Sequence, residues 1–494
     1  MALPPAKLFL SALFHAVIGG CGWYHYTAMN CLEPFIKQFT NSTMSSATNN
    51  QIVVLWSLMT AIFIVGGIIG SLFLSCLMER YGRVFTVIIL KNLILILGSY
   101  LQYISKLTRQ LGLLFVGRFL TGVASCAQLI LPVFMAECCP DKYRGLMSAI
   151  CALGLQLWAV MGALCGLPQL LGTEDLWQYA LLFPAVPGLL HLASSLVIPE
   201  SPKYLFITKK DPDQAEQAIR FYYGGDVDVE EVLHGYDTEA QMAQHEHSAN
   251  LWQVLTVRHL RWPFLLCLVA SMSICADASD IVYQYSTGIM MDVFSNQNNA
   301  VLLTVLLIQL PSFASAAAGM TLVEVTGRRV LFLSGLLICI CGTVLLFLSG
   351  VIDNVHADTF LNVAGLVLIL VGDSLGPSIV RTFLAGELCP QTSRALTGGA
   401  QIVAEAVSAT LASFYYPPVK ETIGTYAILP FSLLGVSSWL FLYFFLPETK
   451  GKPVNEIVAQ WLDKEAENEQ QLFFDPADST SDQMDTELPD NPEN

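Results

Sequence analysis

The chain has 494 residues, of which 54% are hydrophobic and only 13% are charged, with a mean hydropathy of +0.55. Soluble globular proteins carry roughly 25% charged residues, so this composition excludes a water-soluble protein and favours a helical membrane protein. The formal net charge of -16 arises largely from the chain end, where eleven Asp or Glu and one Lys lie from Asp463 onward, and no basic patch indicates nucleic-acid binding.

The first part of the chain holds six apolar runs, each long enough for the roughly 20 residues that cross a bilayer. We expect spans near residues 8–28, 52–76, 84–104, 111–134, 146–167 and 177–197. The first run is not interpreted as a cleaved signal peptide, because it continues to about Ala28 without a small-residue cleavage site. A glycosylation sequon, Asn41-Ser42-Thr43, follows this run.

A polar stretch separates these spans from six more. The later runs lie near residues 262–290, 299–323, 330–350, 359–383, 395–416 and 424–446. The fold class is therefore an all-α membrane protein with twelve transmembrane helices in two six-helix halves. We expect a first half at 1–198, a cytoplasmic linker with short helices at 199–261, a second half at 262–449, and an acidic cytoplasmic tail at 450–494. From about residue 455 this tail is expected to start as a helix and then become disordered.

The positions of Lys and Arg predict the orientation. With both termini in the cytoplasm, seventeen of the 24 lie on the cytoplasmic side and four outside, at Lys37, Lys106, Arg109 and Lys420. The sequon at Asn41 then falls in the first external loop, where glycosylation is expected.

Three motifs occur twice along the chain. Gly-Arg pairs lie at Gly82 and Gly327, an E-x-C-P-x-x-x-R pattern begins at Glu137 and at Glu387, and Pro-Glu-Ser or Pro-Glu-Thr begins at Pro199 and at Pro447. The offsets are 245, 250 and 248 residues. Three pairs in one order indicate a duplicated six-helix unit, which is typical of transporters that hold solute between two halves. A channel or a membrane enzyme is the alternative.

The charged residues of these motifs can act in two ways. The Arg side chains can reach helix-terminal carbonyls or carboxylates and form a cytoplasmic latch, or they can anchor the helix ends at the headgroups. The candidate gating or salt-bridge residues are Arg80, Arg83, Glu137, Arg144, Glu324, Arg328, Arg329, Glu387 and Arg394, together with the intramembrane Arg118.

The motifs resemble those of the sugar porter family of the major facilitator superfamily, in particular its facilitative hexose transporters. The resemblance rests on Gly117-Arg118-Phe119, on Tyr285-Ser286-Thr287, on the segment from Pro199 to Leu205, and on the segment from Pro447 to Gly451. It implies sugar binding along the seventh span. The chain departs from the family's sugar-binding positions at Ala152, Ile274, Cys275, Asp280, Thr382, Glu405 and Ala406.

Ionisable and polar residues inside the spans are candidates for the solute site. Asp277 and Asp280 share one helix face, and they, Asp373, Glu405 and Arg381 could form a solute site, a proton relay or a static ion pair. The candidate solute-binding residues are Asp280, Tyr283, Gln284, Thr287, Ser312, Gln156 and Glu405, with Gln128 and Gln309 as further polar groups. His15 is either a satisfied buried residue or a functional one. Gly376-Pro377 is a gate hinge or a static kink.

The sequence predicts facilitated diffusion of a hexose, glucose-like or fructose-like, by alternating access. A proton-coupled sugar or organic-ion carrier, or a transporter-like solute sensor, are the alternatives. We expect no enzyme activity, no metal or other cofactor, and no nucleic-acid partner. The expected partners are a monosaccharide or similar small polar solute and the lipid bilayer, for a plasma-membrane protein that functions as a monomer.

Overall fold

A computed structural model describes residues 4–44, 46–125, 127–225, 227–245, 249–294, 296–352, 354–452 and 456–457. Eleven of its helical stretches are long and apolar enough to cross a membrane. The first ten correspond to the first ten expected spans, and the last, Thr392–Phe445, covers the final two around a turn at Gly424 (φ +65°). The chain is therefore a multi-pass helical membrane protein, and the prediction of twelve crossings is confirmed.

The first half is a bundle of helices whose ends are set by local signals. Thr48 caps α4, because its Oγ1 accepts from the backbone N–H of Gln51 and its own N–H donates to Gln51 Oε1 (2.9 Å). The same helix ends at Gly82, whose φ of +100° favours glycine. The helices are α1 (Ala6–Phe14), α2 (Tyr24–Cys31), α3 (Glu33–Thr43), α4 (Asn49–Tyr81), α5 (Lys91–Thr108), α6 (Leu111–Ser125), α7 (Ala127–Glu137), α8 (Arg144–Cys165), α9 (Trp177–Leu182) and α10 (Ala185–Ala193).

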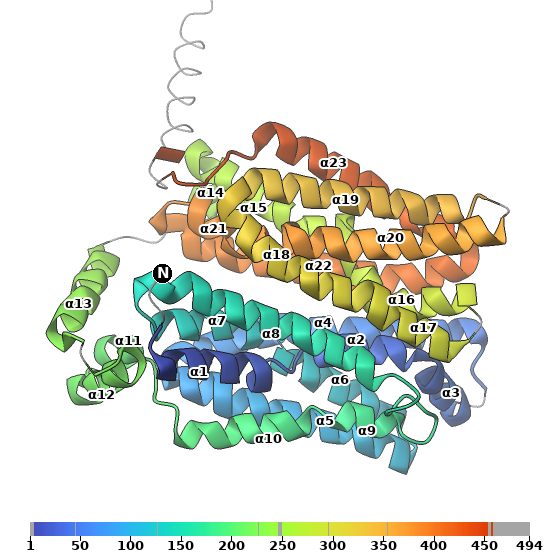
Figure 1. Ribbon diagram of the computed structural model, residues 1–494, viewed down its shortest axis with the longest axis horizontal. Helices are drawn as coiled ribbons and strands as arrows, with labels where there is room; N and C mark the ends of the chain where they lie inside the picture. Colours follow the sequence, from blue (N-terminus) through green and yellow to red (C-terminus); the bar gives the residue numbers. More distant parts are fainter. Residues whose placement is uncertain are drawn as a thin grey trace, which may run out of the picture.

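Short helices follow the first half at one end of the molecule (Figure 1). They are α11 (Pro202–Ile207), α12 (Pro212–Tyr223), α13 (Val229–His245) and α14 (Leu251–Thr256). We call this the linker end and the opposite end, where α3 lies, the far end.

The second half repeats the bundle plan. Its helices are α15 (Arg258–Ala276), α16 (Ser279–Phe294), α17 (Gln297–Leu303), α18 (Leu310–Thr326), α19 (Arg328–Ser349), α20 (Val355–Leu375), α21 (Pro377–Leu388), α22 (Gln391–Ile423) and α23 (Leu429–Phe445). Two of its crossings are interrupted, between α15 and α16 and between α20 and α21. Discontinuous helices at membrane depth are characteristic of transporters, because the freed backbone groups can line a solute path.

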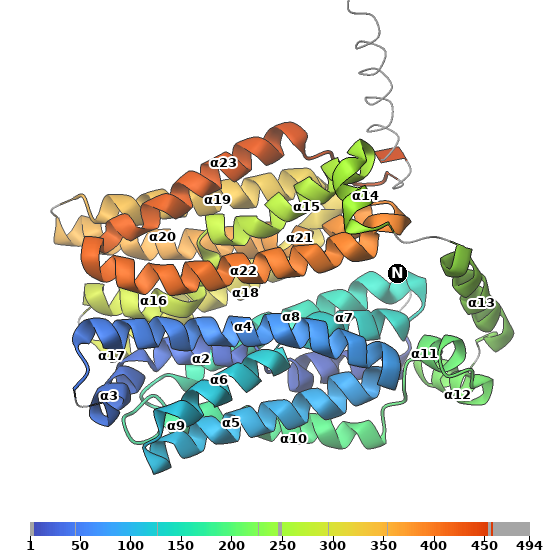
Figure 2. The same cartoon turned by 180° about the vertical axis from the view of Figure 1, so that it is seen from behind.

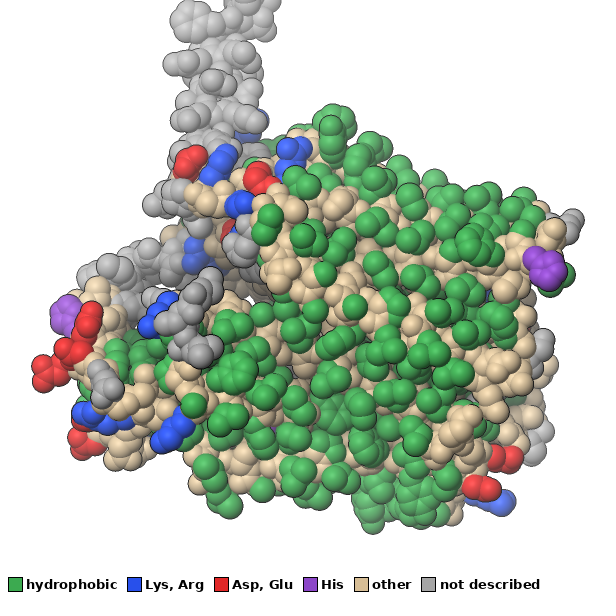
Figure 3. All heavy atoms as spheres, viewed as in Figure 1, with side chains coloured by type: hydrophobic (Ala, Val, Ile, Leu, Met, Phe, Trp, Pro, Cys, Tyr) green, Lys and Arg blue, Asp and Glu red, His purple; other side chains and the backbone are tan. Residues whose placement is uncertain are grey.

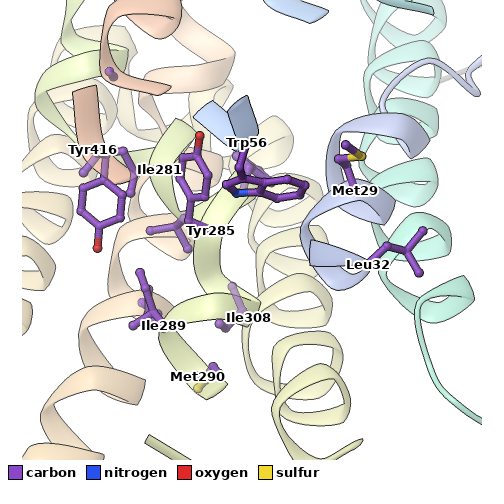
Figure 4. Close-up of a cluster of buried hydrophobic side chains, with 14 of the residues drawn as sticks. Met29, Leu32, Trp56, Ile281, Tyr285, Ile289, Met290, Ile308 and Tyr416 are labelled. Carbon is purple, nitrogen blue, oxygen red and sulfur yellow. The ribbon is translucent and has the colours of Figure 1, made fainter. Parts of the chain in front are cut away.

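The two halves lie side by side, and α16, α18 and α22 face α2, α4 and α8 (Figures 1 and 2). Toward the far end they share one apolar cluster, in which Met29, Leu32 and Trp56 come from the first half and Ile281, Tyr285 and Ile289 from α16 (Figure 4). Toward the linker end, by contrast, two separate clusters fill the halves, one around Phe134 and one around Phe332. In this conformation, the two halves are therefore in contact and the path between them is closed at the far end.

The flank of the bundle is apolar. Large side chains such as Leu411, Leu433 and Phe444 are 64%, 64% and 71% exposed. Figure 3 shows hydrophobic side chains over the middle of the face in view, with charged groups gathered toward the two ends. A belt of this kind matches lipid in the middle and water at each end.

Candidate functional site

A break in the seventh crossing organises the centre of the molecule. α15 ends at Ala276, and Ala278 adopts φ +61°, a left-handed conformation that costs a non-glycine residue roughly 1–2 kcal/mol. Asp277 stabilises the restart of the helix, because its Oδ1 accepts from the backbone N–H of Ser279 (2.9 Å). α16 therefore begins deep inside the bundle, with Asp280 in its first turn.

Hydrogen bonds between the halves concentrate on α16. Asn30 of α2 donates from Nδ2 to the Tyr283 carbonyl (3.2 Å) and to Ser286 Oγ (2.8 Å), and its Oδ1 accepts from the Thr287 N–H (3.0 Å). The Cys31 Sγ lies 3.4 Å from the Thr287 Oγ1. These residues are buried, so the first half holds α16 through contacts that water does not replace.

A second group of contacts surrounds the Tyr283 hydroxyl. It lies within hydrogen-bond distance of Gln156 in the first half and of Ser312 Oγ (3.3 Å) and Ser374 Oγ (3.5 Å) in the second. Ser312 and Ser374 are themselves 2.6 Å apart. Three predicted residues, Gln156, Tyr283 and Ser312, thus converge from α8, α16 and α18.

Asp280 and Gln284 occupy successive turns of α16. The Tyr26 hydroxyl donates to Asp280 Oδ1 (2.5 Å) and accepts from Gln284 Nε2 (3.0 Å). Gln284 Nε2 also donates to Ser413 Oγ of α22. The two predicted residues therefore share one partner from the first half.

The intramembrane charges form a cluster beside this helix start. The Arg381 guanidinium contacts Asp277 Oδ2 (3.3 Å) and Asp373 Oδ1 (2.8 Å), and all three side chains are buried. Asp280 and Glu405 lie within range of the electrostatic field of Arg381. Arg381 therefore joins α21 to the break between α15 and α16.

Arg118 lies in the interior of the first half. Its guanidinium donates to the His25 carbonyl (2.9 Å) and lies 4.5 Å from the ring centroid of Phe63. It ties α6 to α2 and α4, away from the linker-end motifs. His15 also lies within the first half, in a buried group where its Nδ1 is 2.8 Å from His191 Nε2.

Gln309 is 1% exposed, and its amide has no hydrogen-bond partner among the described residues. A buried amide without partners is costly unless a ligand or water satisfies it, so Gln309 remains a solute-site candidate. The side chain of Gln128 lies outside the described residues.

At the linker end, the motifs of the first half form one polar group. Arg83 makes a bidentate contact to Glu137 (2.7 and 2.8 Å), and Ser201 Oγ donates to the same carboxylate (2.8 Å). Glu200 accepts from the backbone N–H groups of Arg83 (2.9 Å) and Val84 (3.0 Å). Burial raises the pKa of the Glu200 carboxyl, and the N–H donors oppose that rise.

The second half repeats this group residue for residue. Arg328 Nε donates to Glu387 Oε1 (3.2 Å), Thr449 donates to Glu387, and Glu448 accepts from the backbone N–H of Arg328 (2.9 Å). Arg83 and Arg328 each also donate to a carbonyl at the end of the preceding helix, of Met78 and Val323 respectively. The carboxylate and carbonyl contacts expected of the Arg side chains are both present, and each set lies within one half.

The glycines of these motifs are required by the neighbouring carboxylate. Gly82 and Gly327 have φ of +100° and +98°. A Cβ on Gly82 would lie 2.4 Å from Glu200 Oε2, and one on Gly327 would lie 2.6 Å from Glu448 Oε2. Any side chain at either position would therefore displace the carboxylate that binds the next two backbone N–H groups.

The other predicted linker-end residues lie around these two groups. Arg80 lies over the Tyr81 ring and its carbonyl accepts from the Tyr204 hydroxyl, and Arg329 donates to the Tyr443 carbonyl (2.6 Å). Arg144 and Arg394 stand in the first turns of α8 and α22. The Glu324 side chain lies outside the described residues.

The predicted hinge coincides with the second interrupted crossing. Gly376 separates α20 from α21, which begins at Pro377. A Cβ on Gly376 would lie 2.2 Å from the Leu331 carbonyl, so the close approach of α19 requires glycine here. Asn41 is exposed in α3, at the far end.

Several site residues were missed from the sequence. Tyr26, Asn30, Ser374 and Ser413 have no motif around them, and Tyr26 is 254 residues from its partner Asp280. Only the polar character of these residues within apolar runs could have marked them as candidates.

Comparison with known proteins identifies relatives along almost the whole chain. A family model described as "Sugar (and other) transporter" matches residues 12–461. The human facilitated glucose transporter member 3 of solute carrier family 2 is 27% identical over 472 residues, covering 92% of each chain. Human member 14 is 26% identical over 476 residues, covering 92% of this chain and 88% of its own.

Solved structures share the fold. The inward open conformation of the xylose transporter XylE from E. coli superposes with a TM-score of 0.72 at 17% identity, covering 92% of this chain and 100% of XylE. The major facilitator superfamily proton:xylose symporter XylE bound to 6-bromo-6-deoxy-D-glucose gives 0.69 at 17% identity, covering 92% of this chain and 99% of its own. These matches confirm the major facilitator fold.

Proposed function

This chain belongs to the sugar transporter family, and from that premise we propose that it carries a hexose across the membrane by facilitated diffusion. The matched family is one of transporters and not of enzymes, so the reaction proposed is movement of the solute without covalent change. The curated relatives named facilitated glucose transporter support a hexose as the solute class.

The observation that carries the proposal is the meeting of both halves on one broken helix. Asn30, Tyr26 and Gln156 of the first half all bond to α16, and the apolar cluster seals the far end around it. If these contacts break while the linker ends approach, the polar side chains between the halves become accessible from the other side. Such an exchange is alternating access.

Within this mechanism we assign solute contacts to the polar side chains that converge between the halves: Gln156, Asp280, Tyr283, Gln284, Thr287, Ser312 and Glu405. Hydroxyl and amide groups of this kind can exchange hydrogen bonds with sugar hydroxyls. We assign the linker-end groups around Glu137 and Glu387 to holding the helix ends of each half together. Gly376-Pro377 is assigned to the hinge.

We further propose a topology and a setting for the carrier. The Lys and Arg distribution supports a cytoplasmic linker end with both termini inside, and a far end that faces outward with a glycan on Asn41. We place the carrier in the plasma membrane as a functional monomer, without enzymatic activity. The unit boundaries proposed are 1–198, 199–261, 262–449 and 450–494.

Uptake of labelled glucose and fructose into cells that lack hexose transport tests the function. We expect saturable uptake that does not change between two external pH values. Absence of uptake of either sugar, from protein shown to reach the cell surface, would contradict the hexose function and leave organic ions or sensing.

A proton-coupled sugar carrier is the second candidate, and the buried Asp280 favours it. A carboxylate at membrane depth can carry a proton between the two sides. Hexose uptake that rises at acid external pH, and loses this rise in Asp280→Asn, would replace facilitated diffusion by proton coupling.

A further inference from the structure

Buried carboxylates outnumber cations at the break before α16. Asp277 and Asp373 share the single guanidinium of Arg381, and Asp280 and Glu405 lie within reach of the same charge. On the first-half side, the Arg118 guanidinium donates from Nη1 to the His25 carbonyl. Among the described residues, four carboxylates thus lie around one guanidinium group, that of Arg381. Uncompensated charge at membrane depth is expensive, so the region favours an added positive charge.

Two acceptor oxygens near Tyr26 have no hydrogen-bond donor among the described residues. Asp280 uses Oδ1 for the Tyr26 hydroxyl, and no donor from the described residues reaches Oδ2. Gln284 uses its Nε2 for Tyr26 and Ser413, and its Oε1 likewise has no donor within the described part of the chain. The two residues are 5% and 3% exposed and lie four apart on α16. Both oxygens lack a donor within the described residues, so a bound ligand could supply one.

Aromatic rings cluster around Tyr26, the hydrogen-bond partner of both Asp280 and Gln284. The ring centroids of Trp23 and Tyr26 are 5.7 Å apart, and those of Trp23 and Tyr283 are 5.6 Å apart. The ring centroids of Tyr26 and Tyr283 are 6.2 Å apart, so the three rings form one cluster, and Tyr26 carries the hydroxyl that donates to Asp280. The face of an aromatic ring attracts a cation, and most strongly in a desolvated site.

A protonated amino group would match the negative charge, the two acceptor oxygens and the aromatic rings together. A protonated amine supplies three N–H donors and a positive charge, whereas a sugar hydroxyl supplies one donor and no charge. Resting on the proposed sugar-carrier function, we propose that the solute carries a protonated amino group, as a hexosamine does, and that its ammonium binds between Asp280 Oδ2 and Gln284 Oε1. The remaining hydroxyls then face Tyr283, Ser312 and Gln156.

Uptake of labelled D-glucosamine and D-glucose into cells that lack hexose transport tests the proposal. Because a charged hydrogen bond and a ring contact are added, we expect glucosamine to be preferred by about tenfold or more. N-acetyl-D-glucosamine, which is neutral, is expected to lose that preference. Asp280→Asn is expected to reduce the ratio of glucosamine uptake to glucose uptake to about twofold or less, since Asn keeps the shape but not the charge.

Asp292→Asn is the matched control. Asp292 lies on the same helix, but its carboxylate is exposed and pairs with Lys420 (2.5 Å). We expect this variant to retain the preference for glucosamine. Equal uptake of both sugars by the unchanged protein, or a preference that survives Asp280→Asn, would overturn the ammonium site. Glucose uptake that rises at acid external pH, together with no preference for glucosamine, would indicate that a proton supplies the positive charge. That result would also overturn the ammonium site.

Thermal unfolding of the purified protein separates this proposal from the carrier function. Glucosamine is expected to raise the unfolding temperature of the unchanged protein and of Asp292→Asn but not of Asp280→Asn, each compared with the same protein without ligand. If neither sugar is taken up, the carrier function fails. In that case, a rise in unfolding temperature with glucosamine that depends on Asp280 would still support the ammonium site, and its absence would contradict the site.

Discussion

Asn30→Ala removes the side chain through which α2 holds α16. Three hydrogen bonds are lost, to the Tyr283 carbonyl, to Ser286 and from the Thr287 N–H. Hydrogen bonds between transmembrane helices average about 0.6 kcal/mol each, so the three together contribute about 2 kcal/mol. That is roughly a 20-fold change in an equilibrium constant. Because the bonds exist only while the halves meet here, the change favours the state that is open at the far end.

Thiol labelling of Cys31 measures this opening of the far end. Its thiol is buried against Thr287 in the closed arrangement, so a membrane-impermeant thiol reagent reaches it only after the halves separate. The labelling rate of Cys31 is expected to rise by up to about 20-fold in Asn30→Ala, with Cys31→Ser as the blank.

Thr27→Ala is the control for this measurement. Thr27 lies one turn earlier on α2, is also buried, and donates to the Ala159 carbonyl (2.7 Å) within the same half. Its loss should leave the labelling rate unchanged. A rise of less than about threefold in Asn30→Ala, or an equal rise in Thr27→Ala, would refute the inference that these bonds hold the far end shut.

Further predictions concern stability and topology. Gly82→Ala should lower thermal stability by about 1–3 kcal/mol more than Gly224→Ala. Both glycines have similar φ values (+100° and +98°), but only Gly82 faces a carboxylate. Equal losses of stability would contradict this prediction. Glu137→Gln should lower the free energy of unfolding by about 1.5–3 kcal/mol, as measured by thermal unfolding. The loss should exceed that of Glu387→Gln, because the contact from Arg328 Nε to Glu387 is longer (3.2 Å) than that from Arg83 Nε to Glu137 (2.7 Å). The reverse order would be inconsistent with the geometry. Asn41→Gln should abolish the endoglycosidase-sensitive mobility shift; a glycan that persists would have to be attached elsewhere.

The linker-end motifs show how far a repeat in the sequence can predict tertiary structure. Glu137 and Glu387 were identified as a pair from their spacing, and each does receive the Arg of its own half. Duplication makes the two environments alike, so one pattern predicts two sites. It does not reveal that Ser201 and Thr449, the last residues of the third repeated motif, complete them, because spacing along the chain does not say which motifs meet.

At the centre, the resemblance directed attention to the segment from Asp280 to Thr287, and the structure places this segment between the halves. The break at Ala278 was not predicted, since alanine is a strong helix former and gives no local signal for a left-handed conformation.

The sequence by itself determined the membrane class, the spans and the duplication, because each follows from local hydropathy and from spacing along the chain. Only the tertiary structure decided which residues meet. Tyr26 bonds to Asp280 and Asn30 to Ser286 across more than 250 residues, and each contact depends on how two six-helix halves pack together. Packing is set by the shape and chemistry of both surfaces at once, and neither can be obtained from the periodicity of one helix.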